Sequence, residues 1–316
     1  MRVLVTGGNG FLGFESILRL VARGDSVIAL DSQITEPLLE LASNSPNIRA
    51  VAGDITDLAN LVQVFKAYKP DAVLHFAAIV GVPASLASPS NILRVNVQGS
   101  LNVFEAMHLF GVRRVIHMSS EEVYGDFQCG VADEDHPQVP LMPYGITKLA
   151  VERFGRAYKE LHGLECINIR TSWVYGVRLN RPRPPMNYLN AALTGRPMRL
   201  QVGGDTVTDY TYIDDVVDGV LLALDHAAHA YNTYNIASGQ ALSDRELVEH
   251  IKTLLPKADV TIGEGRREYA PGVRIPIKGA LNCRRAHMAF GYTPKYDICR
   301  GLAAYIDNWR EMTRAE

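Results

Sequence analysis

Short apolar stretches rich in β-branched residues alternate with amphipathic stretches through the first half of the chain. The apolar stretches cover residues 2–6, 26–30, 48–53, 72–78, 113–120 and 166–172. Their nearly unbroken apolar character predicts strands that are buried on both faces. Helical spacing marks the stretches between them, near 11–22, 57–68, 91–110 and 144–162. Strands and helices in alternation predict a doubly wound parallel sheet of the Rossmann type, and therefore an α/β fold.

The alternation ends near residue 173, where a Pro- and Arg-rich stretch, "VYGVRLNRPRPP", cannot continue a helix. Further helices are expected at 185–195, 212–227 and 243–255, the last with Ser243 as its N-cap and Glu246 at the third helical position. We expect a smaller α/β substrate-binding lobe over the carboxyl ends of the strands. The predicted division is a dinucleotide-binding domain at 1–172, to which 205–237 return, and a lobe formed by 173–204 and 238–316.

Composition narrows the possible partners. The 316 residues are 47% hydrophobic, which is enough for a large core, and the net charge of -2 gives no field that attracts nucleic acid or an anionic membrane. A small molecule is therefore the expected partner. Four widely spaced cysteines without a CxxC motif favour a reducing compartment over disulfides or a metal site. With no recognisable leader or membrane-length apolar run, a cytoplasmic location is expected.

A glycine triplet follows the first predicted strand. Gly7, Gly10 and Gly13 open the first predicted helix, with Phe11 and Leu12 between them. Glycines at this spacing let the backbone approach a pyrophosphate, which then lies at the positive end of the helix. These five residues are expected to contact a dinucleotide.

The next strands end in residues that suit the same ligand. Asp31 ends the second strand and can accept hydrogen bonds from the adenosine ribose, and its charge would repel a 2′-phosphate, so NAD is favoured over NADP. Asp54 and Ile55 follow the third strand and are expected near the adenine. The small side chains of Ala77 and Ala78 follow the fourth strand and leave room for ribose and phosphate.

Tyr144 and Lys148 are four residues apart in a predicted helix, so both side chains lie on one face. A phenol with an ordinary pKa of about 10 is a poor base near neutrality, but a nearby ammonium favours its phenolate. Tyr144 can then take a proton from a substrate hydroxyl. The alternative is an exposed helix pair without chemistry.

Together these motifs resemble the extended short-chain dehydrogenase/reductase family, and in particular its NAD-dependent epimerase/dehydratase branch. The resemblance extends over nearly the whole chain and rests on the stretches "TGGNGFLG", "GDITD", "HFAA", "RVNVQGSLNVFEA", "SSEEVYG", "YGITK", "VYG", "DYTYIDDVV" and "FGYTPKYD".

The resemblance implies roles for individual residues. Tyr144 would be the catalytic base or acid, and Lys148 would also contact the nicotinamide ribose. Ser120 would hydrogen-bond the reacting oxygen. Asn96 would support the cofactor side, the alternative being a solvent-facing helix residue. Positions near the nicotinamide and substrate would be Thr171, Ser172 and Trp173.

The resemblance also implies a homodimer through helices 91–110 and 144–162. Apolar side chains that could form the seam, or could instead face their own sheet, are Val97, Leu101, Phe104, Phe154 and Tyr158.

The substrate is less clearly indicated. Many relatives carry an Arg that grips a diphosphate where this chain has Thr208, so a bidentate phosphate donor is absent there. Loop arginines that could compensate, or could simply be solvated, are Arg178, Arg181, Arg183, Arg266, Arg267 and Arg274. The resemblance favours a nucleotide-sugar epimerase of the UDP-glucose 4-epimerase kind. An NAD-dependent dehydrogenase of a free sugar acid, polyol or hydroxy acid is the alternative.

Two acids, Glu121 and Glu122, follow the fifth predicted strand. Ser119 and Glu122 have the spacing of a capping box, with Ser119 directed toward the backbone, and acids suit the first turn of a helix. Alternatively, the resemblance gives Glu122, and in dehydratases also Glu121, a proton-transfer role. Sugar-nucleotide 4,6-dehydration or decarboxylation therefore remains a third possibility.

Overall fold

A computed structural model describes residues 1–179 and 181–315, so that Asn180 of the Pro- and Arg-rich stretch and Glu316 lie outside the described residues. The chain divides into two compact units, each described by itself below. The first unit comprises residues 1–125, 138–170 and 220–234. The second comprises residues 126–137, 171–219 and 235–316.

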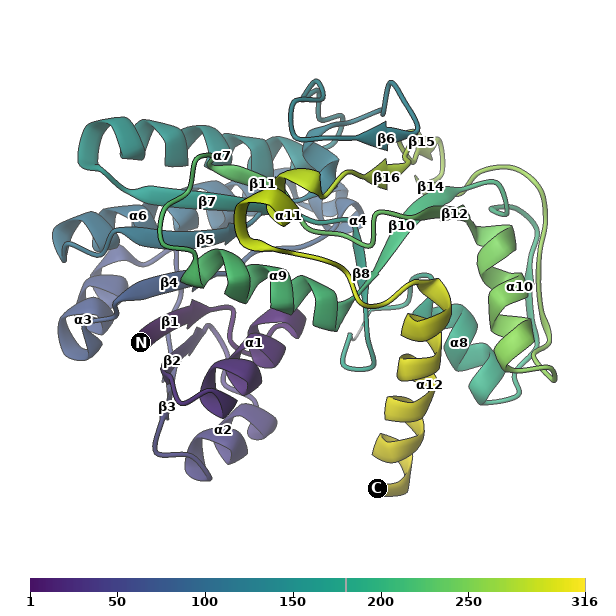
Figure 1. Cartoon of the computed structure of the whole chain (residues 1–316), viewed down its shortest axis with the longest axis horizontal. Coiled ribbons are helices and arrows are strands. Elements are labelled where there is room, and N and C mark those ends of the chain that lie inside the picture. Colours follow the sequence, from purple (N-terminus) through teal and green to yellow (C-terminus); the bar gives the residue numbers. More distant parts are fainter. Residues whose placement is uncertain (180, 316) are drawn as a thin grey trace. The chain divides into compact units, whose positions relative to one another are not determined.

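The first unit is built on a seven-stranded sheet with the order β11-β7-β5-β4-β1-β2-β3 (Figure 1). Neighbours from β3 through β7 run parallel, as shown by pairs such as Val3 with Val27 and Ile116 with Ile167. Its strands are β1 (Arg2–Thr6), β2 (Ser26–Asp31), β3 (Ile48–Ala52), β4 (Ala72–His75), β5 (Arg114–Met118), β7 (Glu165–Arg170) and β11 (Thr233–Asn235). The predicted Rossmann-type α/β fold is confirmed. The carboxyl ends of β1 to β5 and of β7 therefore meet at one edge of the sheet.

Helices of the first unit cover the sheet because their apolar faces pack on its buried strands. Leu4 and Leu30 share a core cluster with Phe65 of α3 and Phe104 of α6, whereas Ile17 of α1 lies on the Ala29 side of the sheet. The helices are α1 (Phe11–Ala22), α2 (Glu36–Ser43), α3 (Leu58–Tyr68), α4 (Val82–Ala87), α5 (Pro89–Ile92), α6 (Gly99–Leu109) and α7 (Pro143–His162). A further helix, α9 (Ile213–Asp225), has residues in both units.

The single helix expected at 91–110 is interrupted. Residues Leu93–Gln98 form a π-helical segment (η1) between α5 and α6. A π-helical turn inserts one extra residue per turn and so redirects the side chains that follow it. Asn96 lies in this segment and is 1% exposed, so the alternative of a solvent-facing residue is excluded.

Helix α7 has clear start and stop residues. Pro143 occupies the first turn, where no backbone donor is lost, and Gly163 ends the helix in the left-handed conformation with φ 69°. The Gly163 and Leu164 amides donate to the Lys159 and Tyr158 carbonyls. Midway along, a Cβ on Gly155 would lie 2.6 Å from the Cys166 sulfur. Gly155 therefore sets how closely α7 approaches β7.

The second unit contains small sheets with helices. β10 (Val207–Tyr212) pairs parallel with β8 (Trp173–Tyr175) and antiparallel with β12 (Ala241–Ser243). Two-stranded pairs are β13 (Val260–Ile262) with β9 (Met198–Leu200), β14 (Glu268–Ala270) with β15 (Val273–Arg274), and β16 (Ala280–Leu281) with β6 (Val131–Ala132). The helices are α8 (Met186–Leu193), α10 (Asp244–Leu254), α11 (Arg284–Phe290) and α12 (Ile298–Ala315).

Polar side chains fix the ends of elements in this unit. Ser243 and Glu246 form the predicted capping box of α10. The fully buried carboxylate of Asp209 accepts hydrogen bonds from Thr211, from the Ser238 hydroxyl at 2.6 Å, and from the Leu281 amide at 3.1 Å. Because burial outweighs these bonds, the pKa of Asp209 rises to about 6.

Gly155 provides a test of the packing between α7 and β7. Replacement by Ala forces a methyl group against Cys166, and such overpacking is expected to lower the free energy of unfolding by about 1–3 kcal/mol. Gly130→Ala is the matched control, because a Cβ there meets nothing within 4 Å. Urea unfolding of both variants measures the difference, and equal midpoints would contradict the close approach.

Candidate active site

The glycine loop after β1 has the geometry of a tight strand-to-helix turn. Gly7 has φ 75°, and its amide donates to the Leu30 carbonyl at 2.8 Å. A Cβ on Gly13 would lie 2.1 Å from the Gly7 carbonyl oxygen, so only glycine allows this turn. Among the described residues, no side chain caps α1 at Gly10, and its first turn carries no acidic residue. The first-turn amides, including those of Phe11 and Leu12, therefore present a positive helix end.

The ends of β2 and β3 lie next to this loop along the sheet. One Asp31 oxygen accepts the Asn9 amide at 3.0 Å, which orients the carboxylate toward the loop. Asp54 accepts the Thr56 amide at 2.8 Å and so shapes the turn after β3. Ile55 is buried, and its carbonyl accepts the Asn102 side chain at 3.0 Å. Their expected contacts with the adenosine half of a cofactor stay predictions.

The end of β4 is held by Asn96. Its carboxamide accepts the Ile79 amide at 2.8 Å and donates to the Ile79 carbonyl at 3.0 Å. It also donates to the Thr147 hydroxyl at 3.3 Å, which lies between Tyr144 and Lys148 on α7. Asn96 thus fixes the segment that follows Ala77 and Ala78 relative to the helix of the predicted catalytic pair.

A second contact joins the ends of β1 and β4. A Cβ on Gly7 would lie 2.8 Å from the Ala77 amide nitrogen, and that amide donates to the Thr6 hydroxyl at 3.3 Å. The glycine loop and the predicted phosphate-side alanines are therefore adjacent.

Tyr144 and Lys148 are both buried on one face of α7, with exposed fractions of 7% and 4%. The Lys148 nitrogen lies 5.9 Å from the centre of the Tyr144 ring and donates to the Met118 carbonyl at 2.7 Å. Burial lowers the pKa of Lys148 to about 8, while the charge of Glu152 acts to raise it. The exposed-pair alternative is therefore wrong, and the ammonium lies close to the phenol.

Ser120 lies at the end of β5, and the expected capping pattern at this point is wrong in detail. Ser120, and not Ser119, is the N-cap of a short 3-10 helix, η2 (Glu121–Val123), and its hydroxyl oxygen accepts the Glu122 amide at 3.2 Å. The Ser119 hydroxyl instead donates to the Glu152 carboxylate at 2.6 Å. A 3-10 turn brings the cap one residue closer than the spacing of an α-helical capping box requires. Both Glu121 and Glu122 are buried, at 1% and 7% exposed.

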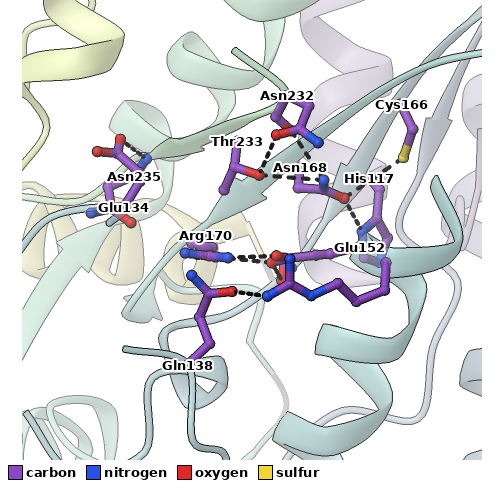
Figure 2. Close-up of polar contacts among 12 residues, drawn as sticks. His117, Glu134, Gln138, Glu152, Cys166, Asn168, Arg170, Asn232, Thr233 and Asn235 are labelled. Carbon is purple, nitrogen blue, oxygen red and sulfur yellow. Dashed lines mark hydrogen bonds and ion pairs between the residues drawn. The ribbon is translucent and has the colours of Figure 1, made fainter. Parts of the chain in front are cut away.

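A buried ion pair that the sequence did not reveal joins α7 to β7. Glu152 and Arg170 have side chains 5% and 3% exposed, and their closest nitrogen and oxygen atoms are 2.6 Å apart (Figure 2). The Arg170 Nε donates to the second Glu152 oxygen at 2.9 Å, and the guanidinium lies 4.8 Å from the Tyr124 ring centre. Two features of the sequence could have indicated these residues. Glu152 follows Lys148 by four residues, and Arg170 is a charged residue within an apolar strand.

Two histidines inside the sheet were also missed. His75 contacts the Thr6 and Ser100 hydroxyls at 2.7 and 2.8 Å. His117 contacts the Asn168 side chain at 2.9 Å (Figure 2). Burial, with the charge of Lys148 as a second cause, lowers the pKa of His75 to about 3 and that of His117 well below its usual range. Both imidazoles are therefore neutral at physiological pH.

In the second unit, the predicted substrate residue Trp173 lies close to two arginines. Its ring lies 5.4 Å from the Arg183 guanidinium and 5.0 Å from that of Arg267. Thr171 and Ser172, which precede it, are buried, and their hydroxyl oxygens have no hydrogen-bond partner within residues 1–179 and 181–315. Hydroxyls without a protein partner suit a polar ligand.

Thr208 and several loop arginines of this unit are already engaged in contacts within the protein. Thr208 is 1% exposed in β10, paired with Leu242. Arg267 forms an ion pair with Asp244 at 2.6 Å, and Arg274 forms one with Asp126 at 2.6 Å. Arg266 donates to the carbonyls of residues 275 and 276. Arg178 is exposed and Arg181 half-buried.

Only some of the apolar side chains predicted to form the dimer seam are exposed. Phe104 is fully buried in the core of its own unit, and Leu101 and Tyr158 pack against that core. Phe154 is 40% exposed, and Leu161, two turns further along α7, is 72% exposed. Association through α6 and α7 stays a prediction, which the particle mass in solution would test.

None of the helices in the described residues is both long and apolar enough to cross a membrane. Within the same residues, no three His, Cys, Asp or Glu side chains are grouped so as to hold a metal ion.

Comparisons with known proteins agree with this geometry. A family model described as "NAD dependent epimerase/dehydratase family" matches residues 3–237. The UDP-glucose 4-epimerase of Mycolicibacterium smegmatis is 32% identical over 99% of this chain and 100% of its own length. A dTDP-glucose 4,6-dehydratase of Xanthomonas campestris is 29% identical over 96% of this chain and 92% of its own. The structure of a Thermotoga maritima UDP-glucose 4-epimerase with UDP-glucose has a TM-score of 0.88 at 26% identity, covering 99% of this chain and 100% of that one.

The burial of Lys148 predicts a pH dependence of stability. Below pH 8 the folded and unfolded chains both carry the protonated lysine, so the folded chain bears the full cost of burying the charge. Between the folded pKa of about 8 and the ordinary 10.5 the unfolded chain binds more protons, so the free energy of unfolding rises with pH, by up to about 3 kcal/mol.

Lys148→Met is expected to abolish this rise, because its side chain does not titrate. Urea unfolding at a series of pH values measures the effect, with Lys159→Met, an exposed lysine of the same helix, as the control that keeps the rise. Parallel curves for wild type and Lys148→Met would contradict the buried ammonium.

Proposed function

Because the chain belongs to the NAD-dependent epimerase/dehydratase family, with NAD as its cofactor, we propose that it inverts a secondary hydroxyl of a nucleotide-linked sugar, as a 4-epimerase of the UDP-glucose type. The observation that carries this proposal is the placement of Tyr144 beside the Lys148 ammonium on the inner face of α7. A buried phenol next to a buried cation is suited to exchanging a proton with a substrate hydroxyl.

The residues of the first unit fit the cofactor. The positive end of α1 and the close turn at Gly13 suit a pyrophosphate, and Asp31 suits an unphosphorylated ribose. When bound, NAD accepts a hydride from a secondary alcohol carbon and can return it. Residues expected to hold it are Gly7, Gly10, Phe11, Leu12, Gly13, Asp31, Asp54, Ile55, Ala77, Ala78, Asn96, Tyr144 and Lys148.

Side chains of this protein carry out the proton transfer in the proposed reaction. In the proposed reaction the Tyr144 oxygen takes the hydroxyl proton as the alcohol is oxidised, and gives it back when the alcohol is re-formed. The Lys148 ammonium stabilises the phenolate between these two steps. Ser120, whose oxygen already accepts the Glu122 amide, donates its own hydrogen to the substrate oxygen and holds the reacting carbon in place.

A nucleotide-linked substrate is supported by the relatives and weakened by Thr208. The relatives' names refer to UDP- and dTDP-sugars. In this chain the charge of Arg267 is balanced by Asp244, and that of Arg274 by Asp126. We propose that the diphosphate contact lies on the loop that carries Arg178 and Arg181, because this loop directly follows Trp173 and the buried hydroxyls of Thr171 and Ser172, which suit the sugar. A free sugar acid, polyol or hydroxy acid held by one of these arginines is the alternative, and the enzyme would then be a dehydrogenase.

One experiment separates the epimerase from the dehydrogenase. The purified protein is incubated with excess NAD and, separately, with UDP-glucose, UDP-galactose, dTDP-glucose and free sugar acids. We expect the two UDP-sugars to interconvert without net NADH. Stoichiometric release of NADH with any of these substrates would overturn the epimerase and support the dehydrogenase.

Tyr144→Phe tests the proposed chemistry in either case. Loss of the proton-transfer group is expected to lower turnover by about 10²–10⁴-fold with the fold intact. Tyr158→Phe, the same change about four turns further along α7, is the control and should retain activity. Undiminished turnover in Tyr144→Phe would exclude the proposed role.

Glu121 and Glu122 keep 4,6-dehydration as a second candidate, because both carboxylates are buried directly after Ser120. If Glu122 transfers a proton after oxidation, Glu122→Gln should block formation of the 4-keto-6-deoxy product from dTDP-glucose while oxidation of the bound sugar persists. If η2 only supports Ser120, Glu122→Gln should leave the reaction type unchanged. Formation of UDP-galactose and no keto sugar in the wild type would exclude the dehydratase.

A further inference from the structure

Three functional side chains follow one another at four-residue steps along α7. Tyr144, Lys148 and Glu152 are all buried on the same face. A lysine and a glutamate at this spacing normally attract each other. Here the lysine donates instead to the Met118 carbonyl at 2.7 Å, and the glutamate binds elsewhere.

The partners of Glu152 come from two other strand ends. Its carboxylate accepts both the Arg170 Nε at 2.9 Å and a terminal Arg170 nitrogen at 2.6 Å, and the Ser119 hydroxyl donates to it at 2.6 Å. The Ser119 amide in turn donates to the Ile169 carbonyl at 2.8 Å. The carboxylate is thus fully engaged by a forked guanidinium and by the residue next to Ser120.

We propose that Arg170 is a positioning residue, which draws the Glu152 carboxylate away from Lys148 so that the lysine's positive charge stays available to Tyr144. The inference rests on the proposed role of Tyr144, and it assigns to Arg170, whose side chain is 3% exposed, an effect that is exerted through Glu152 and Lys148. It differs from a purely structural ion pair because it predicts the direction in which each change moves the ionisation of Tyr144.

Among the other titratable groups around this cluster, two histidines and a cysteine carry no charge. His75 of β4 and His117 of β5 are neutral, because burial and the Lys148 charge lower their pKa values. Burial, followed by the Glu152 charge, raises the pKa of Cys166 of β7, which keeps that thiol protonated. The remaining groups packed against α7 from η2 and its end are Glu121, Glu122 and Tyr124.

Three variants give opposite expectations. In Arg170→Gln the Glu152 carboxylate loses its partner, turns to Lys148 and cancels its charge, so Tyr144 becomes harder to ionise. In Glu152→Gln the anion is gone and Tyr144 becomes easier to ionise. In the double variant Glu152→Gln/Arg170→Gln the two neutral amides replace the pair, and the ionisation of Tyr144 returns close to that of wild type.

The measurement follows the tyrosinate itself and does not require turnover. Ultraviolet absorbance is titrated with pH for each protein and for the same protein carrying Tyr144→Phe, and the difference reports Tyr144 alone. We expect the midpoint to rise by about one pH unit or more in Arg170→Gln, to fall in Glu152→Gln, and to return to within about half a unit in the double variant. The basic limb of the turnover profile should move in the same directions.

The matched control is an ion pair between β5 and β7, the two strands that precede Ser119 and contain Arg170. Arg114 of β5 and Glu165 of β7 are register partners, with nitrogen and oxygen 2.6 Å apart, at the opposite end of these strands from Ser120. Arg114→Gln, Glu165→Gln and their double variant should leave the Tyr144 midpoint unchanged. Thermal unfolding is recorded for all variants, and if Arg170→Gln does not fold, the Glu152→Gln and double variants still carry the test.

Two outcomes would overturn the inference. One is a Tyr144 midpoint that is equal in wild type, Glu152→Gln and the double variant. The other is a shift that the Arg114–Glu165 variants reproduce. Neither outcome affects the proposed function, which is tested separately by the turnover of Tyr144→Phe and by the release of NADH.

Discussion

The buried carboxylate of Glu152 is the contact on which the candidate active site depends. It joins α7, which carries Tyr144 and Lys148, to the ends of β5 and β7 through Ser119 and Arg170. Removing one partner of such a pair leaves a charge without compensation and costs about 3–5 kcal/mol. The ion pair therefore couples the stability of the sheet to the position of the candidate catalytic side chains. Since Ser119 precedes Ser120 directly, the same contact also limits where that hydroxyl can lie.

Close backbone approach is the second constraint. Gly7 and Gly13 bring the turn after β1 against the end of β4, where Ala77 follows. Gly155 brings α7 onto β7 at the level of Cys166. The first approach lies at the carboxyl end of β1, beside the proposed cofactor site. The second lies near the amino end of β7 and fixes the distance of α7, which carries Tyr144, from the sheet.

Much of this could be predicted from local pattern. Helix α1 begins and ends at the predicted residues, and the strands and the Ser243 capping box follow the expected stretches to within a few positions. Other features could not. The π-helical turn at 93–98 interrupts the continuous helix that was expected. Asn96 lies within this turn, where its side chain is buried and accepts the Ile79 amide. The Ser119 hydroxyl has a partner 33 residues away and not the nearby backbone.

Local spacings in the amino-acid sequence were enough to predict the fold class and the cofactor, and they indicated Tyr144 and Lys148 as the candidate catalytic pair. Each prediction depends on spacings of a few residues: alternation along a strand, three residues between glycines, four between Tyr144 and Lys148. Which charges are paired depends instead on tertiary packing. Glu152 could have bound Lys148 on its own helix, and only the packing of α7 on β7 brings Arg170 within reach of it. Local geometry offers a residue several partners, and the long-range packing of buried charges selects one.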